Sequence, residues 1–227
     1  MTITYHPNLI QGEQAWMDIR RGRICASEMS KVLTPTLKIA DNADTRSHVY
    51  ELAAQRLTGY TEPTYFGDEM LRGVTEEPLA RQLYHDNFNP VKECGFITND
   101  DNGFTIGYSP DGLVGDDGLI EIKSRRQKFQ VQSIVEGEVP KEHVLQIQTG
   151  LLVTGRKFCD YVSYSGGLPL WPIRAYPDEA IHEAIIAACG AFEAKVAKVV
   201  NAYHERLMTE KWVMTERLVE ADGEIVL

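Results

Sequence analysis

The fold is decided by residues 109–123, whose sequence is SPDGLVGDDGLIEIK. The run GDDG inside it is a turn signal, and the alternation that follows predicts a strand over Leu119–Lys123. Side chains two residues apart in a strand share a face, so Glu121 and Lys123 project together while Ile122 points into the core. The stretch therefore predicts a strand that holds a carboxylate and an ammonium side by side.

Asp111 lies before that turn, and folding back across nine residues can bring its carboxylate beside Glu121. Two hard oxygen ligands and a nearby backbone carbonyl suit Mg²⁺ or Mn²⁺. Two such ions about 4 Å apart can activate water, offset phosphate charge and assist the leaving oxygen in phosphodiester hydrolysis. Lys123 can position or deprotonate the water and stabilise the transition state.

The alternative is that Asp111 only starts a turn and that Glu121 and Lys123 form an ordinary exposed ion pair. Apolar residues flank Glu121 on both sides. A carboxylate buried there would be costly without a partner or a metal, which favours the functional interpretation.

Three further clusters can contribute to the same site, and each also has an ordinary interpretation. Residues 72–78, RGVTEEP, contain Glu77, which either adds a carboxylate or is a solvated residue before the proline. Residues 16–27, WMDIRRGRICAS, carry three arginines within four residues and a serine at a predicted helix start, which form either a phosphate receptor or a solvated basic face. Residues 146–148, QIQ, place two amides on a predicted helix, where they are surface groups unless that helix faces the site.

The hydrophobic pattern around these clusters changes period along the chain, from helical to strand-like and back. Pro78 is expected to kink its helix or to begin a second segment. The predicted helices are Glu13–Arg21, Ser27–Leu33, Arg46–Thr58, Asp68–Phe88, Glu142–Val153 and Asp178–Leu207. The predicted strands are Val91–Thr98, Phe104–Tyr108, Leu119–Lys123, Phe158–Ser163 and Leu170–Tyr176.

This order of elements predicts a layered α/β or α+β fold in which helices flank a central mixed β-sheet. The sequence has no repeat and no Pro/Gly/Ser-rich linker, so we expect one domain over residues 1–227. Its parts are a helical N-terminal region (12–88), a sheet core (91–176) and a helical C-terminal region (178–227).

The overall charge points away from nucleic acid as a partner, because 33 acidic and 23 basic residues leave a net charge of −10. The charge is unevenly distributed, however. Ten acidic and five basic residues follow Pro177, whereas Lys123, Arg125, Arg126 and Lys128 form a basic run. Exposed charges more than about 10 Å apart are largely screened, so a phosphate responds to the local cluster. The composition excludes a broad basic surface and leaves room for a localised site.

The N-terminal residues lack a signal peptide, and the most apolar stretch, Ala184–Phe192, is too short to span a membrane. We therefore expect a cytoplasmic protein with no membrane partner. Its four cysteines show no metal-cage spacing and are expected to be buried, reduced thiols.

Together the clusters resemble the bacteriophage lambda exonuclease family, or YqaJ-type viral recombinases, within the PD-(D/E)XK nuclease superfamily. The resemblance covers roughly residues 12–165 through W-x3-R-x-G-x-I-x-A-S-E, G-x3-E-P, S-P-D-G-L, E-I-K and Q-x-Q. It implies a restriction-endonuclease-like core. The segment 33–45 does not match closely, so the loop that would contact the DNA end is undefined.

The activity implied by the resemblance is a magnesium-dependent exonuclease that degrades one strand of linear double-stranded DNA from its 5′-phosphate end. It would release 5′-mononucleotides and leave 3′ overhangs for phage recombination by strand annealing. The resemblance also implies two Mg²⁺ ions, replaceable by Mn²⁺, a ring-shaped homotrimer, and a single-strand annealing protein as partner in the cytoplasm of a bacterial host.

The resemblance assigns roles to individual residues. The expected metal ligands are Asp111, Glu121 and the Ile122 carbonyl, with Glu77 near the second ion and Lys123 as the catalytic lysine. The expected contacts to the 5′-phosphate and DNA are Arg20, Ser27, Trp16, Gln146, Gln148, Arg125 and Arg126. Met70 and Leu71 fall where an apolar wedge would separate the strands, although two adjacent apolar residues on a helix can equally belong to the core.

Three other functions remain open. One is another nuclease of the same superfamily, either an endonuclease or an iron–sulfur helicase-associated type; the latter needs four clustered cysteines, which the spacing here does not offer. Another is a catalytically silent protein that binds DNA ends, although the presence of Asp111, Glu121 and Lys123 together counts against it. The third, an acidic DNA mimic or protein-binding module, is indicated by the charge alone.

Overall fold

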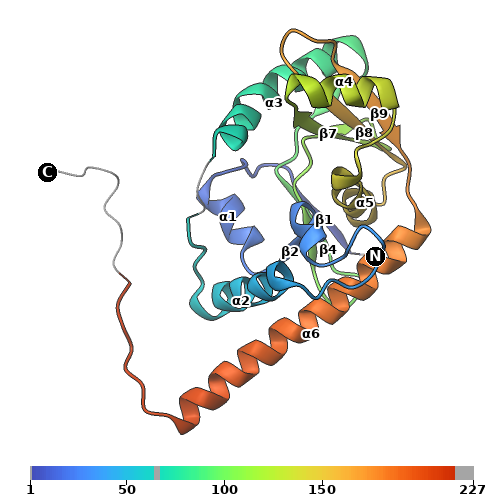
Figure 1. Ribbon diagram of the computed structural model, residues 1–227. Helices are drawn as coiled ribbons and strands as arrows, with labels where there is room; N and C mark the ends of the chain where they lie inside the picture. The colour runs from blue at the N-terminus through green and yellow to red at the C-terminus, as the bar shows by residue number, and fades with distance from the viewer. Residues whose placement is uncertain (1, 64–66, 218–227) are drawn as a thin grey trace, which may run out of the picture.

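The computed structural model describes residues 2–63 and 67–217, which form two mixed sheets flanked by helices (Figure 1). The helices are α1 (Gln14–Arg20), α2 (Ala43–Thr58), α3 (Asp68–Asn87), α4 (Gln127–Glu136), α5 (Lys141–Thr154), α6 (Glu179–Thr209) and the 3₁₀ helix η1 (Ala26–Lys31). The strands are β1 (Ile3–His6), β2 (Ile24–Cys25), β3 (Val91–Lys92), β4 (Phe96–Asn99), β5 (Ile106–Tyr108), β6 (Gly112–Val114), β7 (Gly118–Ser124), β8 (Phe158–Tyr164) and β9 (Trp171–Ala175).

The expected mixed-sheet architecture is confirmed, with the described strands divided between two sheets. The four-stranded sheet has the order β1-β4-β5-β2, and the five-stranded sheet has the order β3-β6-β7-β8-β9. The decisive hairpin is the antiparallel pair β6–β7, in which Gly112 lies opposite Ile120. On its other side β7 runs parallel to β8, with Glu121 opposite Tyr161.

One predicted strand, 91–98, is wrong as a single element, because β3 and β4 belong to different sheets. The chain changes sheet around Gly95. A Cβ on Gly95 would lie 1.8 Å from the Leu9 carbonyl oxygen. Such a close approach of two backbones is open only to glycine, and a pattern based on side chains does not reveal it.

The helices differ from expectation mainly at their ends. The segment after Cys25 is a 3₁₀ helix, and Ser27 is not its cap. Helix α2 begins earlier than predicted, because the side chain of Asn42 accepts a hydrogen bond from the Thr45 N–H at 2.9 Å. Pro78 lies inside one continuous helix, α3, and does not begin a second segment. The strands β1, β2 and β6 and helix α4 were not predicted.

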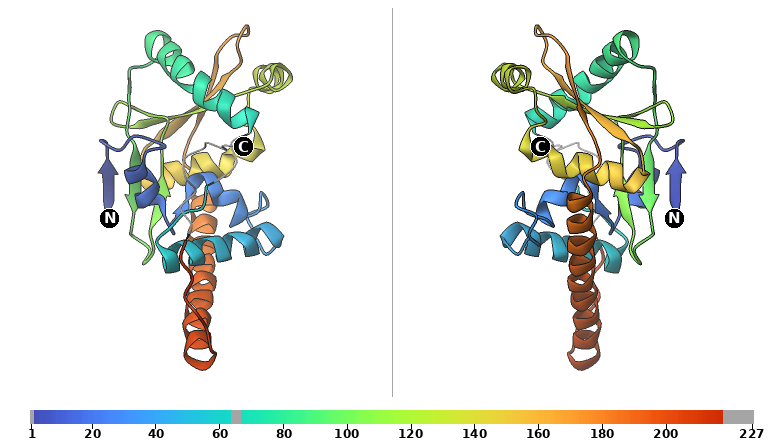
Figure 2. Two further views of the ribbon diagram at one scale, coloured as in Figure 1. Left: turned by 90° about the vertical axis from the view of Figure 1, so that its left-hand side faces the viewer. Right: turned by 90° about the vertical axis from the view of Figure 1, so that its right-hand side faces the viewer.

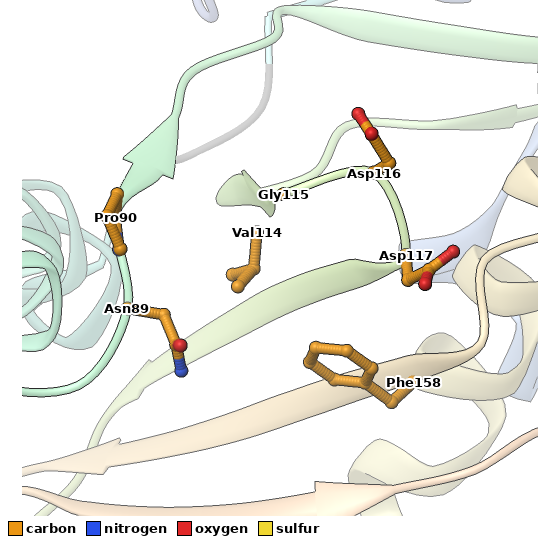
Figure 3. Close-up of a pocket in the computed structure, with 7 residues that line it drawn as sticks. All are labelled: Asn89, Pro90, Val114, Gly115, Asp116, Asp117 and Phe158. Atoms are coloured by element: carbon orange, nitrogen blue, oxygen red, sulfur yellow. The ribbon is translucent and has the colours of Figure 1, made fainter.

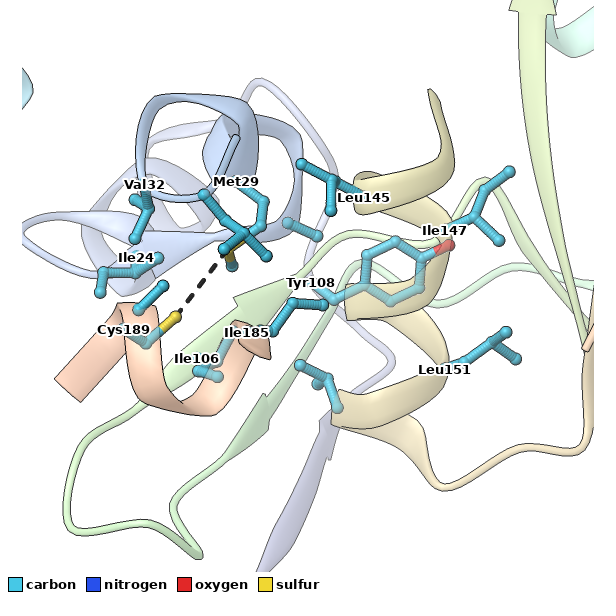
Figure 4. Close-up of a cluster of buried hydrophobic side chains, with 14 of the residues drawn as sticks. Ile24, Met29, Val32, Ile106, Tyr108, Leu145, Ile147, Leu151, Ile185 and Cys189 are labelled. Carbon is cyan, nitrogen blue, oxygen red and sulfur yellow. Dashed lines mark hydrogen bonds between the residues drawn. The ribbon is translucent and has the colours of Figure 1, made fainter. Parts of the chain in front are cut away.

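Strand β7 is buried on both faces because two apolar clusters meet at it. Leu119 belongs to the larger cluster, which joins residues of η1, α2, α5, α6 and the four-stranded sheet. Figure 4 shows the part of this cluster where α5, α6 and η1 meet. Ile120 and Ile122 belong to a smaller cluster beneath α3, with Ala80 and Val162. The expectation that Ile122 is a core residue is therefore confirmed.

All four cysteines are buried and free, as predicted. Three of them, Cys94, Cys159 and Cys189, belong to the large core, where the Cys189 thiol contacts the sulfur of Met29 at 3.9 Å (Figure 4). Helix α6 packs against α2 near its middle, where the His48 and Phe192 rings are in contact, and its C-terminal end extends beyond the rest of the molecule (Figure 2). None of the helices within residues 2–63 and 67–217 combines the length and apolar character that a membrane span requires.

Two helical glycines give a matched test of this packing. A Cβ on Gly150 in α5 would lie 2.7 Å from the ring of Tyr108, whereas one on Gly73 in α3 meets nothing within 4 Å. We expect Gly150→Ala to lower the free energy of unfolding by about 1–3 kcal/mol through overpacking. Gly73→Ala should raise it by about 0.5–1 kcal/mol through helix propensity. Urea unfolding measures both, and equal effects would contradict the packing described.

Candidate active site

Nine of the predicted site residues meet in a pocket of about 210 Å³ at the β6–β7 hairpin. Its walls come from α1, η1, α3, α5 and the ends of β5 and β7. The lining residues are Gln11, Trp16, Arg20, Ala26, Ser27, Glu77, Tyr108, Ser109, Asp111, Glu121, Ile122, Lys123 and Gln146. The structure thus brings together four sequence clusters that lie far apart along the chain.

Glu121 forms the floor of the site, and only 1% of its surface is exposed. One carboxylate oxygen, Oε1, accepts hydrogen bonds from Lys123 Nζ at 2.8 Å and from the Gln146 amide. The other, Oε2, accepts from the Tyr108 hydroxyl at 3.1 Å. The ion pair is therefore buried at its acidic end, which rules out the alternative of an exposed surface pair.

Asp111 lies beside Glu121, as the hairpin predicted. Its Oδ2 accepts a hydrogen bond from the Ile122 N–H at 2.6 Å. Burial raises the pKa of Asp111 well above its ordinary value, and the carboxylates of Glu121 and Glu77 raise it further. Lys123 and the hydrogen bond from the Ile122 N–H lower the pKa of Asp111, but not enough to cancel the increase. The site therefore holds more negative charge than the protein itself neutralises.

Glu77 brings the third carboxylate from α3. Its Oε1 accepts a hydrogen bond from Arg81, one helical turn later, and Arg81 also binds the Asp111 carbonyl oxygen at 2.7 Å. Burial raises the pKa of Glu77, Arg81 lowers it, and Glu121 raises it again. Arg81 thus ties α3 to the hairpin and orients Glu77 towards the other two acids.

Lys123 remains an ammonium in this environment. Burial lowers the pKa of Lys123, but the carboxylates of Glu121 and Asp111 outweigh that effect, and the net shift is upward. Its side chain is 26% exposed, so the charged end reaches the pocket. Lys123 is therefore placed to donate hydrogen bonds to a bound anion.

Arg20 forms the opposite wall. Its guanidinium stacks over the Trp16 ring at 4.3 Å and donates to the Ser27 and Ser109 hydroxyls, each at 3.4 Å. The Trp16 indole N–H also donates to Ser109, at 2.9 Å. Of the basic cluster, Arg20 alone lines this pocket, whereas Arg21 pairs with Asp18. A planar guanidinium between two hydroxyls is suited to bind phosphate.

Three of the expected contacts do not line the pocket. Gln148 is buried elsewhere, where its amide donates to the Tyr176 carbonyl at 2.8 Å and accepts from the Asp178 N–H at 2.9 Å. Gln148 therefore joins α5 to the start of α6. Residues two apart on a helix point about 200° apart, so Gln146 faces Glu121 and Gln148 does not. Arg125 and Arg126 follow the end of β7, and Arg126 pairs with Glu69 at 2.7 Å.

The two apolar residues expected at the strand wedge lie in the first turn of α3. Met70 is 48% exposed and Leu71 is 61% exposed, so neither belongs to the core. The next residue, Arg72, donates a hydrogen bond to Ser124 at the end of β7 at 2.9 Å. The apolar pair therefore lies close to the strand that carries the site.

Four lining residues were not among the expected site residues: Gln11, Ala26, Tyr108 and Ser109. Ser109 directly precedes the Pro-Asp-Gly turn, and Tyr108 ends a predicted strand, so their position next to Asp111 was an available signal. The sequence around Gln11 contains no signal of this kind, because the Gln11 amide donates to the Pro110 carbonyl, which lies 99 residues later in the chain.

A divalent cation fits the chemistry of this site, because three carboxylates surround it and two have a raised pKa. Within the described residues, a different trio, Glu28, His48 and Glu51, has ligand atoms within 4.8 Å of one another. Lys31 lies 3.4 Å from Glu28 and 3.9 Å from Glu51. That trio is therefore an ion-pair network with its own cation, outside the pocket.

A larger pocket, of about 430 Å³, lies at the opposite end of the hairpin (Figure 3). Val114 and Phe158 face each other across it. Its acidic residues are Asp116 and Asp117, and the Asp117 carboxylate binds Lys157 at 2.9 Å. This larger pocket lacks converging buried charges. The smaller pocket, which has them, is therefore the better candidate for the active site.

A comparison with protein families finds a match over most of the chain. A family model described as the YqaJ-like viral recombinase domain matches residues 15–157, which include every residue of the pocket except Gln11. A comparison with curated protein sequences finds no match.

Solved structures give a closer view. An alkaline exonuclease, LHK-Exo from Laribacter hongkongensis, superposes with a TM-score of 0.77 at 32% identity, over 86% of this chain and 98% of that chain. The complex of LHK-Exo with dAMP gives the same TM-score and coverage at 33% identity. A phage-related exonuclease from Haemophilus somnus 129PT, at 13% identity and a TM-score of 0.59, shares the fold over 82% of this chain and 99% of that chain.

The metal-free protein should become more stable when Asp111 loses its charge. Because its pKa is higher in the folded than in the unfolded chain, the free energy of unfolding falls as pH rises from the ordinary value of 3.8. Asp111→Asn keeps an oxygen for the Ile122 N–H but does not ionise. We expect it to be about 1–3 kcal/mol more stable than the parent near neutral pH, with no difference below pH about 4.

Chemical denaturation in chelator across this pH range measures the effect. Asp117→Asn is the matched control, because that carboxylate is exposed. The difference in free energy of unfolding between this variant and the parent should not change with pH. A parent protein that is at least as stable as Asp111→Asn at neutral pH would disprove the charge crowding.

Proposed function

Because the chain belongs to the YqaJ-like viral recombinase family, as its motifs predicted, we propose that it is a magnesium-dependent 5′-to-3′ exonuclease on linear double-stranded DNA. It releases 5′-mononucleotides and leaves 3′ single-stranded overhangs for recombination by strand annealing. LHK-Exo has been crystallised with dAMP, a deoxynucleoside monophosphate of the kind that such a reaction releases.

One observation carries the proposal: buried acids and a charged lysine form one wall of the pocket, while a guanidinium set between two hydroxyls forms the other. The first wall suits the hydrolysis of a phosphodiester. The second suits a terminal phosphate. A site with both walls is suited to cleave next to a DNA end. An enzyme that cuts within a strand would not need a receptor for a terminal phosphate.

Asp111, Glu121 and the Ile122 carbonyl would hold the first Mg²⁺ ion, and Glu77 would bind near a second; Mn²⁺ offers the same ligand preferences. When bound, the ions supply a water of lowered pKa and positive charge opposite the scissile phosphate. Tyr108 and Gln146 hold the Glu121 carboxylate in one orientation through its two oxygens.

Lys123 acts as a donor in this scheme. Its ammonium, held by Glu121, hydrogen-bonds the attacking water or a non-bridging phosphate oxygen and offsets the charge that develops in the transition state. The raised pKa of Lys123 favours this role over that of a base in the metal-free enzyme.

The remaining expectations belong to the same proposal. Met70 and Leu71, exposed at the start of α3, would separate the strands. Residues 1–227 would form a single cytoplasmic nuclease domain, since the large core draws on all three parts of the chain. Three chains would form a ring around the duplex, which sedimentation equilibrium can test, and a single-strand annealing protein would receive the overhang.

The first test compares linear and closed circular duplex DNA, with and without chelator. We expect the protein with Mg²⁺ to digest the linear form alone and to release mononucleotides. Efficient cleavage of closed circles would favour an endonuclease, and binding without cleavage would favour a silent end-binding protein. Lys123→Ala should lower the rate at least about 10²-fold without unfolding the protein. The matched control is Lys157→Ala, which removes a lysine that is 74% exposed and outside the pocket.

Arg20 should distinguish the chemistry of the DNA end. We expect Arg20→Ala to slow digestion of 5′-phosphorylated duplex about 10-fold or more, because a charge-assisted contact is lost, and to leave 5′-hydroxyl ends unaffected. Arg21→Ala is the control, since Arg21 pairs with Asp18 outside the pocket. Equal losses on both kinds of end would remove Arg20 from the phosphate site.

A further inference from the structure

The feature that the proposed chemistry leaves unexplained is an arginine–histidine contact beside Lys123. Arg125 is the first residue after β7 and continues the alternation that places Glu121 and Lys123 on one face. Its backbone N–H donates to the Tyr164 carbonyl at 2.7 Å, so the position of Arg125 is fixed by the sheet. Its Nη1 lies 2.9 Å from Nε2 of His143 in the first turn of α5.

The direction of this hydrogen bond follows from the chemistry of its partners. A guanidinium has only donors, so the histidine nitrogen must be the acceptor. His143 is therefore neutral, with its proton on Nδ1. A protonated ring would place two positive charges and two donors against each other.

The surroundings maintain this neutral form. Burial, Lys123 and Arg125 lower the pKa of His143 to about 4, although Glu142 acts in the opposite direction. The ring is stacked on Tyr161 of β8, with centroids 5.5 Å apart and planes 24° apart. His143 therefore presents a fixed acceptor throughout the physiological pH range.

The guanidinium of Arg125 is held on several sides but remains incompletely satisfied. Besides His143, Nη1 donates to Glu142 at 3.1 Å, and the group lies over the Phe129 ring at 5.0 Å. The side chain is only 11% exposed, and its buried Nε has no partner among the described residues. Because Nε is enclosed and Nη1 is bound to His143 and Glu142, Nη2 is the donor of Arg125 that is left for an anionic ligand.

We propose that His143 is a positioning residue that holds Arg125 next to Lys123, so that Nη2 of the arginine donates to a backbone phosphate of the DNA strand entering the site. This inference rests on the proposed function, because DNA is the source of that phosphate. His143 does not touch the substrate. It fixes the orientation of the arginine that does, and so lowers the entropy that is lost when the phosphate binds.

Three variants isolate the acceptor from the ring. His143→Phe keeps an aromatic ring against Tyr161 but has no acceptor, whereas His143→Gln offers an amide oxygen in place of Nε2. His204→Phe is the control, because His204 is exposed near the C-terminal end of α6. Thermal unfolding of each protein checks that the fold is retained.

The readout is the binding of a fluorescein-labelled, 5′-phosphorylated duplex in Ca²⁺, measured by anisotropy, together with KM and kcat in Mg²⁺. We expect His143→Phe to raise the dissociation constant and KM about 5- to 10-fold, with kcat within about 2-fold, and His143→Gln to restore most of the loss. In an Arg125→Ala background, His143→Phe should have no further effect, because the two residues act as one unit.

The inference is overturned if His143→Phe binds as the parent does, if His143→Gln is as weak as His143→Phe, or if the losses add to that of Arg125→Ala. It is also overturned if the parent protein does not bind duplex DNA. A parent that binds DNA but leaves linear ends undigested would refute the proposed function and not the role of His143, since the binding assay is independent of turnover.

Discussion

The structure depends on one buried carboxylate. Only 1% of the Glu121 surface is exposed, so both oxygens of its carboxylate need donors from the protein. Those donors come from its own strand, from β5 and from α5, through Lys123, Tyr108 and Gln146. Satisfying one acid therefore fixes how the two sheets and α5 meet, and that junction is the pocket.

The same junction holds more acidic groups than its basic groups can neutralise. Asp111 and Glu77 approach Glu121 from the hairpin and from α3, and both have a raised pKa because burial and mutual repulsion outweigh Lys123 and Arg81. A protein under selection for stability alone would not bring these acids together. The conflict between local electrostatics and stability is typical of a functional site, and a divalent cation would relieve it.

The net charge of −10 is compatible with a DNA-binding site because the relevant charges are local. Arg20 lies in the pocket between two hydroxyls, and Arg125 is held beside Lys123 by a neutral histidine. Arg126 lies outside the pocket, in an exposed pair with Glu69. The positive charge available to a phosphate is thus confined to a few oriented groups, and the acidic surplus elsewhere is screened from them.

The sequence by itself determined the hairpin, the pairing of Glu121 with Lys123, the layered mixed-sheet fold and the family, because these follow from alternation and turn chemistry within short segments and from motif order. Only the tertiary structure decided the rest. It divided one predicted strand between two sheets at Gly95, selected Gln146 over Gln148, and brought Tyr108 and Ser109 into the site. The physical reason is that a side chain's neighbours across the fold depend on how helices rotate and how backbones cross. No local pattern of residues records those quantities.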